Sequence, residues 1–139
     1  MNSQISKLEP TSIWKNFVSL NSVPRPSKKE EKVIEFMINF GHSLELETYK
    51  DPAGNVIIRK PASKGMENRK VVILQSHLDM VHQKNEDTVF DFLTQGIESF
   101  VDGQWVTAKG TTLGADNGMG VASIMALLAS KNLTHPPLE

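Results

Sequence analysis

The sequence has 139 residues, of which 39% are apolar and 22% charged, as expected for one globular domain rather than a disordered chain. The net charge of −1 gives no electrostatic reason to expect nucleic acid or an anionic membrane as a partner. Cysteine is absent, so any metal would have to be held by histidine, aspartate or glutamate. The N-terminus lacks the apolar core of a secretory signal, and we expect a cytoplasmic protein.

Two helices are predicted in the N-terminal third of the chain. The first spans residues 10–20, whose apolar side chains repeat at helical spacing. Prolines in residues 23–26 then force an extended link. Ser27 and Glu30 have the spacing of a capping box, which predicts that the second helix begins there and ends at Gly41.

Three strands are predicted next. Apolar and polar residues alternate in 44–48, and residues 51–55 form a turn that leads to a returning strand at 56–59. Residues 71–74 are continuously apolar, which predicts a central strand covered on both faces.

The remaining segments complete an α/β pattern. An Asp-Gly pair within residues 100–106 predicts a tight hairpin, and an apolar helix is predicted from Asn117 to about Ser130. Helices and strands in this order predict an α/β layered fold, a mixed sheet with helices packed on it. The fold is expected to be incomplete, because the chain has few helices to cover both faces of such a sheet.

His77 and Asp79 come at the end of the predicted central strand. Residues two apart in a strand point to the same face, and sites in open α/β sheets collect at the carboxyl ends of strands. Imidazole is a good zinc ligand, and a nearby carboxylate can fix its tautomer. The alternative is a strand end whose two polar side chains only bind loop backbone.

Asp116 lies at the predicted start of the last helix. By itself this position indicates an ordinary N-cap. The dense glycine pattern around it favours a site, because glycine permits unusual backbone conformations and close approach. The glycines concerned are Gly110, Gly114, Gly118 and Gly120. An ionised carboxylate there can bridge two cations, and His82 is close enough in sequence to line the same site.

Two segments, HLDMVHQKN at residues 77–85 and GTTLGADNG at residues 110–118, resemble the aminoacyl-histidine dipeptidases. This family, also called peptidase D or cytosol non-specific dipeptidase, belongs to the dinuclear zinc aminoacylase and carboxypeptidase superfamily. Residues 22–27, 57–62 and 65–70 resemble it as well, so the similarity covers essentially the whole chain.

The resemblance implies that His77 ligates one zinc ion, that Asp116 bridges two, and that Asp79 is a catalytic-site residue that orients His77 without binding metal. A pair of other divalent metal ions is the alternative to zinc. The family commonly has a cis peptide after the bridging aspartate, which predicts a cis bond between Asp116 and Asn117. His82 departs from the family, which usually has proline there.

The resemblance also implies that much of the enzyme is missing from this chain. The family's general-base glutamate, its remaining metal ligands and its lid domain lie downstream of the matching region. We therefore expect residues 1–139 to be the N-terminal part of a catalytic domain, inactive by itself and weak in metal binding. The complete enzyme would hydrolyse dipeptides with free N-termini, including Xaa-His, and the family often forms homodimers.

Two other functions remain open at this stage. An amidohydrolase acting on N-acyl amino acids would share His77, Asp79 and Asp116. A non-catalytic α/β module would keep the fold without the chemistry.

Overall fold

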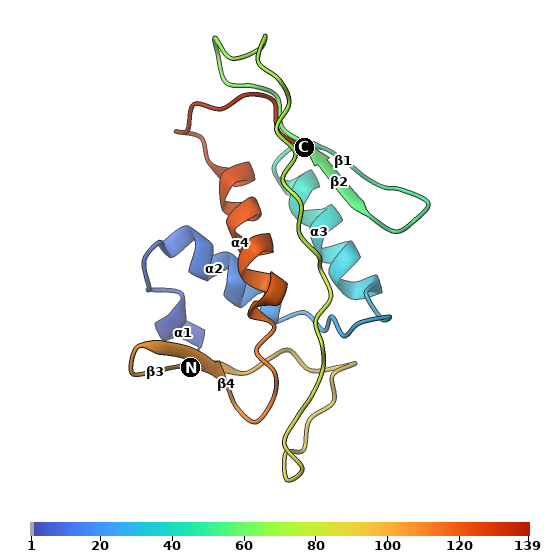
Figure 1. The fold of residues 1–139 in the computed structure, drawn as a ribbon, viewed down its shortest axis with the longest axis vertical. Helices are drawn as coiled ribbons and strands as arrows, with labels where there is room; N and C mark the ends of the chain where they lie inside the picture. The colour runs from blue at the N-terminus through green and yellow to red at the C-terminus, as the bar shows by residue number, and fades with distance from the viewer. Residues whose placement is uncertain (1) are drawn as a thin grey trace.

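The computed structural model describes residues 2–139, which form four helices and four short strands (Figure 1). In chain order the elements are α1 (Asn2–Ile5), α2 (Thr11–Asn21), α3 (Glu31–Ser43), β1 (Glu47–Lys50), β2 (Val56–Arg59), β3 (Ser99–Asp102), β4 (Trp105–Ala108) and α4 (Ala115–Ala129). The α/β class predicted from the sequence is confirmed.

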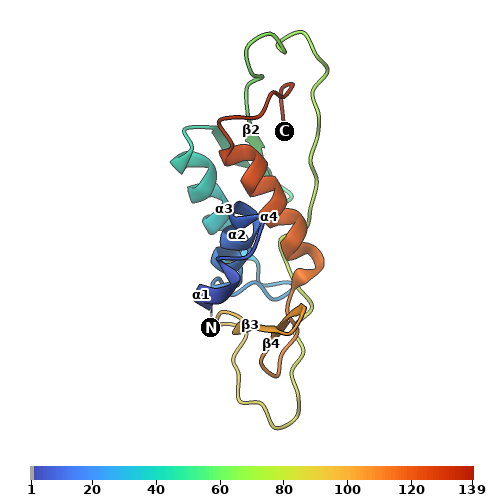
Figure 2. The ribbon, with the colours of Figure 1, turned by 90° about the vertical axis from the view of Figure 1, so that its left-hand side faces the viewer.

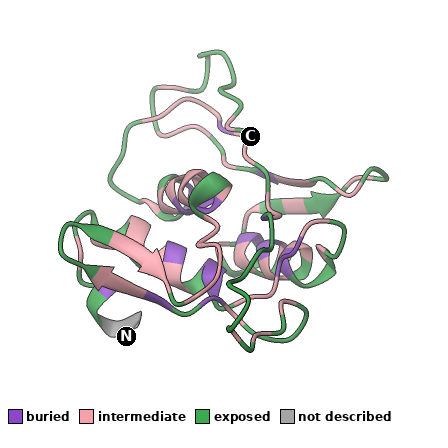
Figure 3. Ribbon diagram, turned by 60° about the horizontal axis from the view of Figure 1, so that its bottom comes forward, coloured by how far each residue is buried: buried purple, intermediate pink, exposed green. Residues whose placement is uncertain are grey.

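The core lies where α2, α3 and α4 meet, and the main helix–helix contact is that of α4 with α2 (Figures 1 and 2). Each of these helices buries one apolar face, as the helical spacing predicted. The buried cluster is completed by one strand residue and consists of Leu20, Val33, Met37, Ile58, Val121, Met125 and Leu128. Figure 3 shows buried residues on these helices, whereas the long loops are mostly exposed or of intermediate exposure.

The second helix differs from its prediction at both ends. It begins at Glu31, with Glu30 as its N-cap and no side-chain cap. The predicted capping box is wrong because the Ser27 hydroxyl donates instead to Asp79 Oδ2, at 2.6 Å. At the other end the helix passes Gly41 and continues to Ser43.

Both predicted hairpins are present, as two separate antiparallel pairs. Strand β1 pairs with β2 across a turn in which the Asp51 carboxylate accepts hydrogen bonds from Asn55. Strand β3 pairs with β4 so that Asp102 lies opposite Trp105, and Gly103 takes a positive φ of 57° in the intervening turn.

Residues 71–74 are extended but not covered, so the prediction of a strand buried on both faces is wrong for this chain. Val71 and Ile73 are 57% and 69% exposed. The segment pairs only with the end of the chain, through a parallel bridge between Val72 and Leu138. Leu138 also bridges Lys60 in the antiparallel sense, which makes a small mixed arrangement. Apolar composition predicts burial only when neighbouring elements are present to supply it.

Among the described residues, no helix is both long enough and apolar enough to span a membrane.

The packing of α4 can be tested with one variant and its neighbour. Met125 is buried in the core, so Met125→Ala should lower the free energy of unfolding by about 2–5 kcal/mol, measured by urea denaturation. Leu127 lies on the exposed side of the same helix, so Leu127→Ala should cost less than about 1 kcal/mol. Equal losses in the two variants would contradict the observed orientation of α4.

Candidate functional site

The structure brings together the three residues that the sequence singled out. The His77 imidazole lies between two carboxylates: its Nδ1 is 3.0 Å from Asp79 Oδ1, and its Nε2 is 3.0 Å from Asp116 Oδ1. Asp79 comes from the same extended segment as His77, whereas Asp116 comes from the start of α4, 39 residues away. A local motif and a distant residue therefore form one site.

Asp116 reaches His77 because the chain does not enter α4 smoothly. Gly114 takes a left-handed conformation with φ 72°, and both Asp116 and Asn117 have non-helical backbone angles. The peptide bond between Asp116 and Asn117 is cis, as predicted. The Asp116 side chain is 94% exposed, so its remaining carboxylate oxygen faces solvent.

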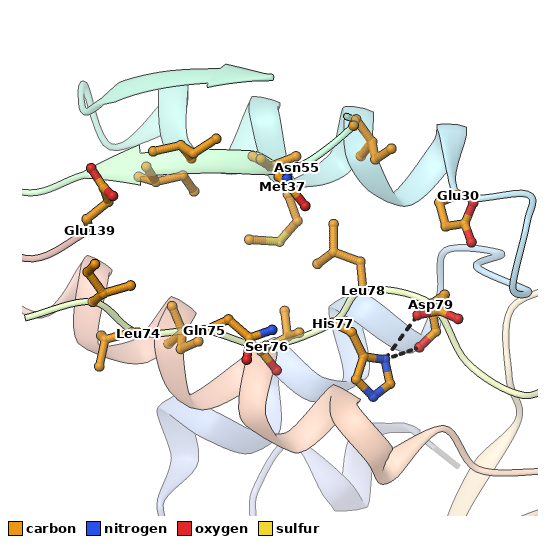
Figure 4. A pocket seen from close by; sticks show the side chains of 18 of the residues that line it. Glu30, Met37, Asn55, Leu74, Gln75, Ser76, His77, Leu78, Asp79 and Glu139 are labelled. Atoms are coloured by element: carbon orange, nitrogen blue, oxygen red, sulfur yellow. Dashed lines mark hydrogen bonds and ion pairs between the residues drawn. The ribbon is translucent and has the colours of Figure 1, made fainter. Parts of the chain in front are cut away.

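Asp79 is held in place from the opposite side. Its Oδ2 accepts a hydrogen bond from the Ser27 hydroxyl, while its Oδ1 faces His77 (Figure 4). The hydrogen bond from Ser27, together with that from His77, lowers the pKa of Asp79 below its ordinary value. An ionised Asp79 favours the His77 tautomer that carries its proton on Nδ1, which leaves Nε2 with a free lone pair.

Arg25 joins the two halves of the site and is almost completely buried. Its Nη1 donates to the carbonyls of Leu78 and Asp79, at 3.1 and 3.4 Å. Its Nη2 donates to the carbonyl of Gly114 at 2.7 Å and to Asn21 Oδ1 at 2.9 Å. Burial lowers the pKa of Arg25 to about 10, so the side chain is still protonated at neutral pH. One cation thus connects the His77 segment to the loop that carries Asp116.

Sequence reasoning missed Arg25 and assigned Ser27 a different role. Arg25 lies in the proline-containing link, and Ser27 directly follows that link. The available signal was an arginine between two prolines in a segment similar to the dipeptidase family, which indicates a residue with a fixed environment. His82, in contrast, contacts Phe92 at a ring distance of 5.6 Å and belongs to an exposed loop.

The side chains of His77 and Asp116 have the chemistry of metal ligands, but two ligands are too few for a complete site. His77 Nε2 and Asp116 Oδ1 point toward each other, and an imidazole whose other nitrogen faces a carboxylate is a common arrangement at zinc sites. Within residues 2–139, however, no group of three or more histidine, aspartate and glutamate side chains is arranged to hold a metal. His77 and Asp116 are therefore two converging side chains, fewer than the four ligands that a zinc ion usually takes.

Comparison with solved structures first defines the fold. The chain superposes on a tripeptidase from Staphylococcus aureus with a TM-score of 0.73 and 17% identity, covering 94% of this chain and 35% of that one. It superposes on the aminopeptidase PepT from Bacillus cereus with a TM-score of 0.71 and 23% identity, covering 91% and 34%. These likenesses show that the chain has part of a peptidase-type fold.

Two proteins with higher sequence identity indicate which kind of peptidase the chain resembles. The aminoacylhistidine dipeptidase from Vibrio alginolyticus gives a TM-score of 0.94 at 51% identity, covering 96% of this chain and 27% of that one. The cytosol non-specific dipeptidase of Escherichia coli K12 is 50% identical over 137 residues. The resemblance to the aminoacyl-histidine dipeptidases is thus confirmed. No protein-family profile matches the chain. The match includes 99% of this chain but only 28% of the Escherichia coli dipeptidase.

The contact between His77 and Asp116 can be tested by titration. The hydrogen bond to Asp116 is the largest cause that raises the pKa of His77 above its ordinary 6.5. Asp116→Asn should therefore lower the pKa of His77, as measured by NMR.

The raised pKa of His77 also makes stability depend on pH. The protonated imidazole stabilises the fold below pH 6.5, and this contribution is lost as the pH rises through the raised value. Asp87→Asn, the same change in an exposed loop, is the control, and equal shifts in both variants would contradict the contact.

The link through Arg25 can be tested by removing its charge. Arg25→Met would leave buried carbonyl groups without donors, so the free energy of unfolding should fall by about 3 kcal/mol or more. Arg59→Met is the matched control, because Arg59 lies at the surface. There it forms ion pairs with Glu47 and Glu139, which contribute about 0–1 kcal/mol, and its guanidinium lies 5.5 Å from the centre of the Tyr49 ring. Urea denaturation of the two variants is the measurement. A loss at Arg25 no larger than that at Arg59 would show that the buried network contributes little.

Proposed function

We propose that this chain is the N-terminal part of the catalytic domain of a metallo-dipeptidase, with the lid domain and the second half of the catalytic domain encoded further along. The contact of His77 with both Asp79 and Asp116 is the observation that carries this proposal. Identity of 50% to the cytosol non-specific dipeptidase of Escherichia coli supports it, as does the small part of that protein which the chain spans.

Each of the three residues has a proposed role that follows from its contacts. His77 would bind one metal ion through Nε2, and Asp116 would bridge two through its exposed carboxylate. Asp79 would accept the Nδ1 proton of His77 and hold the ring in the orientation that presents Nε2. Ser27 would in turn hold Asp79.

Two zinc ions, or another pair of divalent ions, would supply Lewis-acid chemistry and an activated water for peptide hydrolysis. The chain's own residues prepare for that chemistry by controlling protons. His77 must be neutral at Nε2 to accept a metal, so its raised pKa makes metal binding weaken as the pH falls. Asp79 must stay ionised to orient the ring, and its lowered pKa keeps it so at neutral pH.

The substrates of the complete enzyme would be dipeptides with free N-termini, including Xaa-His, and the enzyme would act in the cytoplasm, with a homodimer as its assembly. The piece by itself would be inactive. Two side chains cannot complete the coordination of two zinc ions, and the general base that such a reaction needs is expected elsewhere.

Two alternatives share part of the same support. An amidohydrolase acting on N-acyl amino acids would use the same three residues and differ only in the substrate pocket. A substrate panel on the full-length protein separates the two, since preference for N-acyl amino acids over free dipeptides would refute the dipeptidase proposal. Absence of bound zinc in the full-length protein would favour a non-catalytic module.

Activity of the full-length protein provides the direct test. His77→Ala and Asp116→Ala should each abolish measurable dipeptide hydrolysis and reduce the zinc content found by elemental analysis. Asp79→Asn should retain zinc but lower kcat about 100-fold, because an asparagine can no longer stabilise the Nδ1–H tautomer as a carboxylate does. Glu86→Gln, a change in the exposed loop, serves as the control.

The isolated chain gives the complementary result. Calorimetric titration with zinc should show weak binding only, lost in His77→Ala. Tight binding of two zinc ions by residues 1–139 would overturn the view that the chain carries half of a site.

A further inference from the structure

Residues 81–85, which follow Asp79, pair with residues 110–112, which precede α4, in a short antiparallel ladder. The Thr112 N–H donates to the Gln83 carbonyl at 2.9 Å. A second backbone hydrogen bond, of 2.8 Å, closes the far end of the ladder. The two segments that carry the candidate site are therefore also joined to each other outside the site.

The Thr112 side chain extends this ladder at the point where the backbone turns away from it. In a regular antiparallel pair, opposite residues exchange both of their backbone hydrogen bonds, so the Gln83 N–H would bind the Thr112 carbonyl. Here the Gln83 N–H donates to Thr112 Oγ1 instead, at 3.3 Å. The same hydroxyl donates to the Val81 carbonyl at 2.8 Å, and its contact with the Gln83 carbonyl is longer, at 3.4 Å. One side chain thus takes the place of a backbone group and reaches further toward the site.

This exchange of a carbonyl for a hydroxyl lets the chain leave the ladder while it stays attached to residues 81–83. Two residues after Thr112, Gly114 takes its left-handed conformation, and its carbonyl accepts a hydrogen bond from Arg25 at 2.7 Å. A carbonyl bound in the ladder would hold the backbone straight at this point. The side chain makes the attachment instead, so the backbone is free to turn and to bring Asp116 to the site.

Thr112 and Arg25 join the same two segments at different points. Val81, which Thr112 binds, lies four residues after His77, and Thr112 itself lies four residues before Asp116. Arg25 makes its bonds between this point and the site. Two segments joined at one point can still pivot about it, whereas a second point of attachment removes that motion. The separation of the His77 and Asp116 side chains therefore depends on both attachments.

We propose that Thr112 is a positioning residue of the candidate metal site, whose hydroxyl sets the separation between His77 and Asp116. The proposal rests on the proposed function, in which these two side chains are metal ligands. Distances between a metal ion and its ligands tolerate deviations of only about 0.2 Å. A small pivot of one segment against the other would therefore weaken metal binding and misplace the activated water.

A purely structural role for the Thr112 hydroxyl is the competing explanation. Thr112 is only half-buried, and water competes for its hydrogen bonds, so their net contribution to folding is small. Thr111 offers a direct comparison, because its hydroxyl donates to the carbonyl of its own neighbour, Thr112, at 3.1 Å and does not reach the other segment. Loss of either hydroxyl should affect folding to a similar, small extent, but only Thr112 should affect the site.

The first test measures zinc affinity and dipeptide hydrolysis in the full-length protein. Thr112→Val keeps the shape of the side chain and removes the hydroxyl. It should weaken zinc binding about tenfold, as measured by competition with a chelator, since changes to residues that orient metal ligands cost about 10–100-fold. Turnover, kcat, should fall about tenfold while KM changes less, because an interaction that positions the catalytic metal is lost. Thr112→Ser restores the hydroxyl and should recover both values, and Thr111→Val is the matched control.

The second test needs neither zinc nor substrate. In the metal-free full-length protein with ¹⁵N-labelled histidine, the chemical shift of His77 Nε2 reports its contact with Asp116 at a fixed pH. Thr112→Val should move this signal in the same direction as Asp116→Asn does, whereas Thr112→Ser and Thr111→Val should leave it in place. His77→Ala identifies the signal. Thr112→Ala removes the same hydroxyl and should give the same result, so the test does not depend on the folding of a single variant.

Three results would overturn the proposal. The first is wild-type zinc affinity and an unmoved Nε2 signal in Thr112→Val and Thr112→Ala. The second is failure of Thr112→Ser to recover, or an equal loss in Thr111→Val. The third is a raised KM with unchanged kcat, which would assign the Thr112 hydroxyl to direct contact with substrate. A wild-type protein without zinc or dipeptide hydrolysis would refute the proposed function instead, and the Nε2 signal would still report whether Thr112 positions His77 against Asp116.

Discussion

The geometry of the candidate site depends on the buried guanidinium group of Arg25. This group binds the carbonyls of Leu78 and Asp79 on one side and the carbonyl of Gly114 on the other. Hydrogen bonds from a charged donor are stronger than neutral ones, and burial excludes the water that would compete for these carbonyls. The segment carrying His77 and the loop carrying Asp116 are consequently fixed relative to each other.

Arg25 also explains part of the glycine pattern around Asp116. A Cβ atom at Gly114 or Gly118 would come within 2.5 or 2.7 Å of Arg25 Nη2, and one at Gly120 would overlap Asn117 Oδ1. In the sequence, the density of these glycines favours a ligand site. Glycine is needed at these positions because a larger residue would collide with Arg25 or Asn117. The glycines therefore support the site indirectly, by making room for the side chains around it.

Residues 71–79 contain both an exposed backbone edge and part of the candidate site. This segment carries His77 and Asp79 at one end and exposes apolar side chains and backbone groups along its length. Exposed edges of this kind favour association with another strand.

Several features could be predicted from the sequence because they depend on local patterns. Helices α2 and α4 follow from apolar spacing, and both hairpins follow from their turn residues. The pairing of His77 with Asp79 follows from strand alternation, and the addition of Asp116 and the cis bond after it from the family resemblance.

Tertiary structure decided the rest, because the deciding partners lie far away in the chain. Ser27 has the spacing of a helix cap, yet its hydroxyl binds Asp79, 52 residues away. Arginine side chains usually lie at the surface, yet four acceptors from three segments make the burial of Arg25 possible. Residues 71–74 have the composition of a buried strand, but burial requires neighbours on both sides. Sequence alone thus determined which residues are suited to the site, and long-range packing decided how they are held.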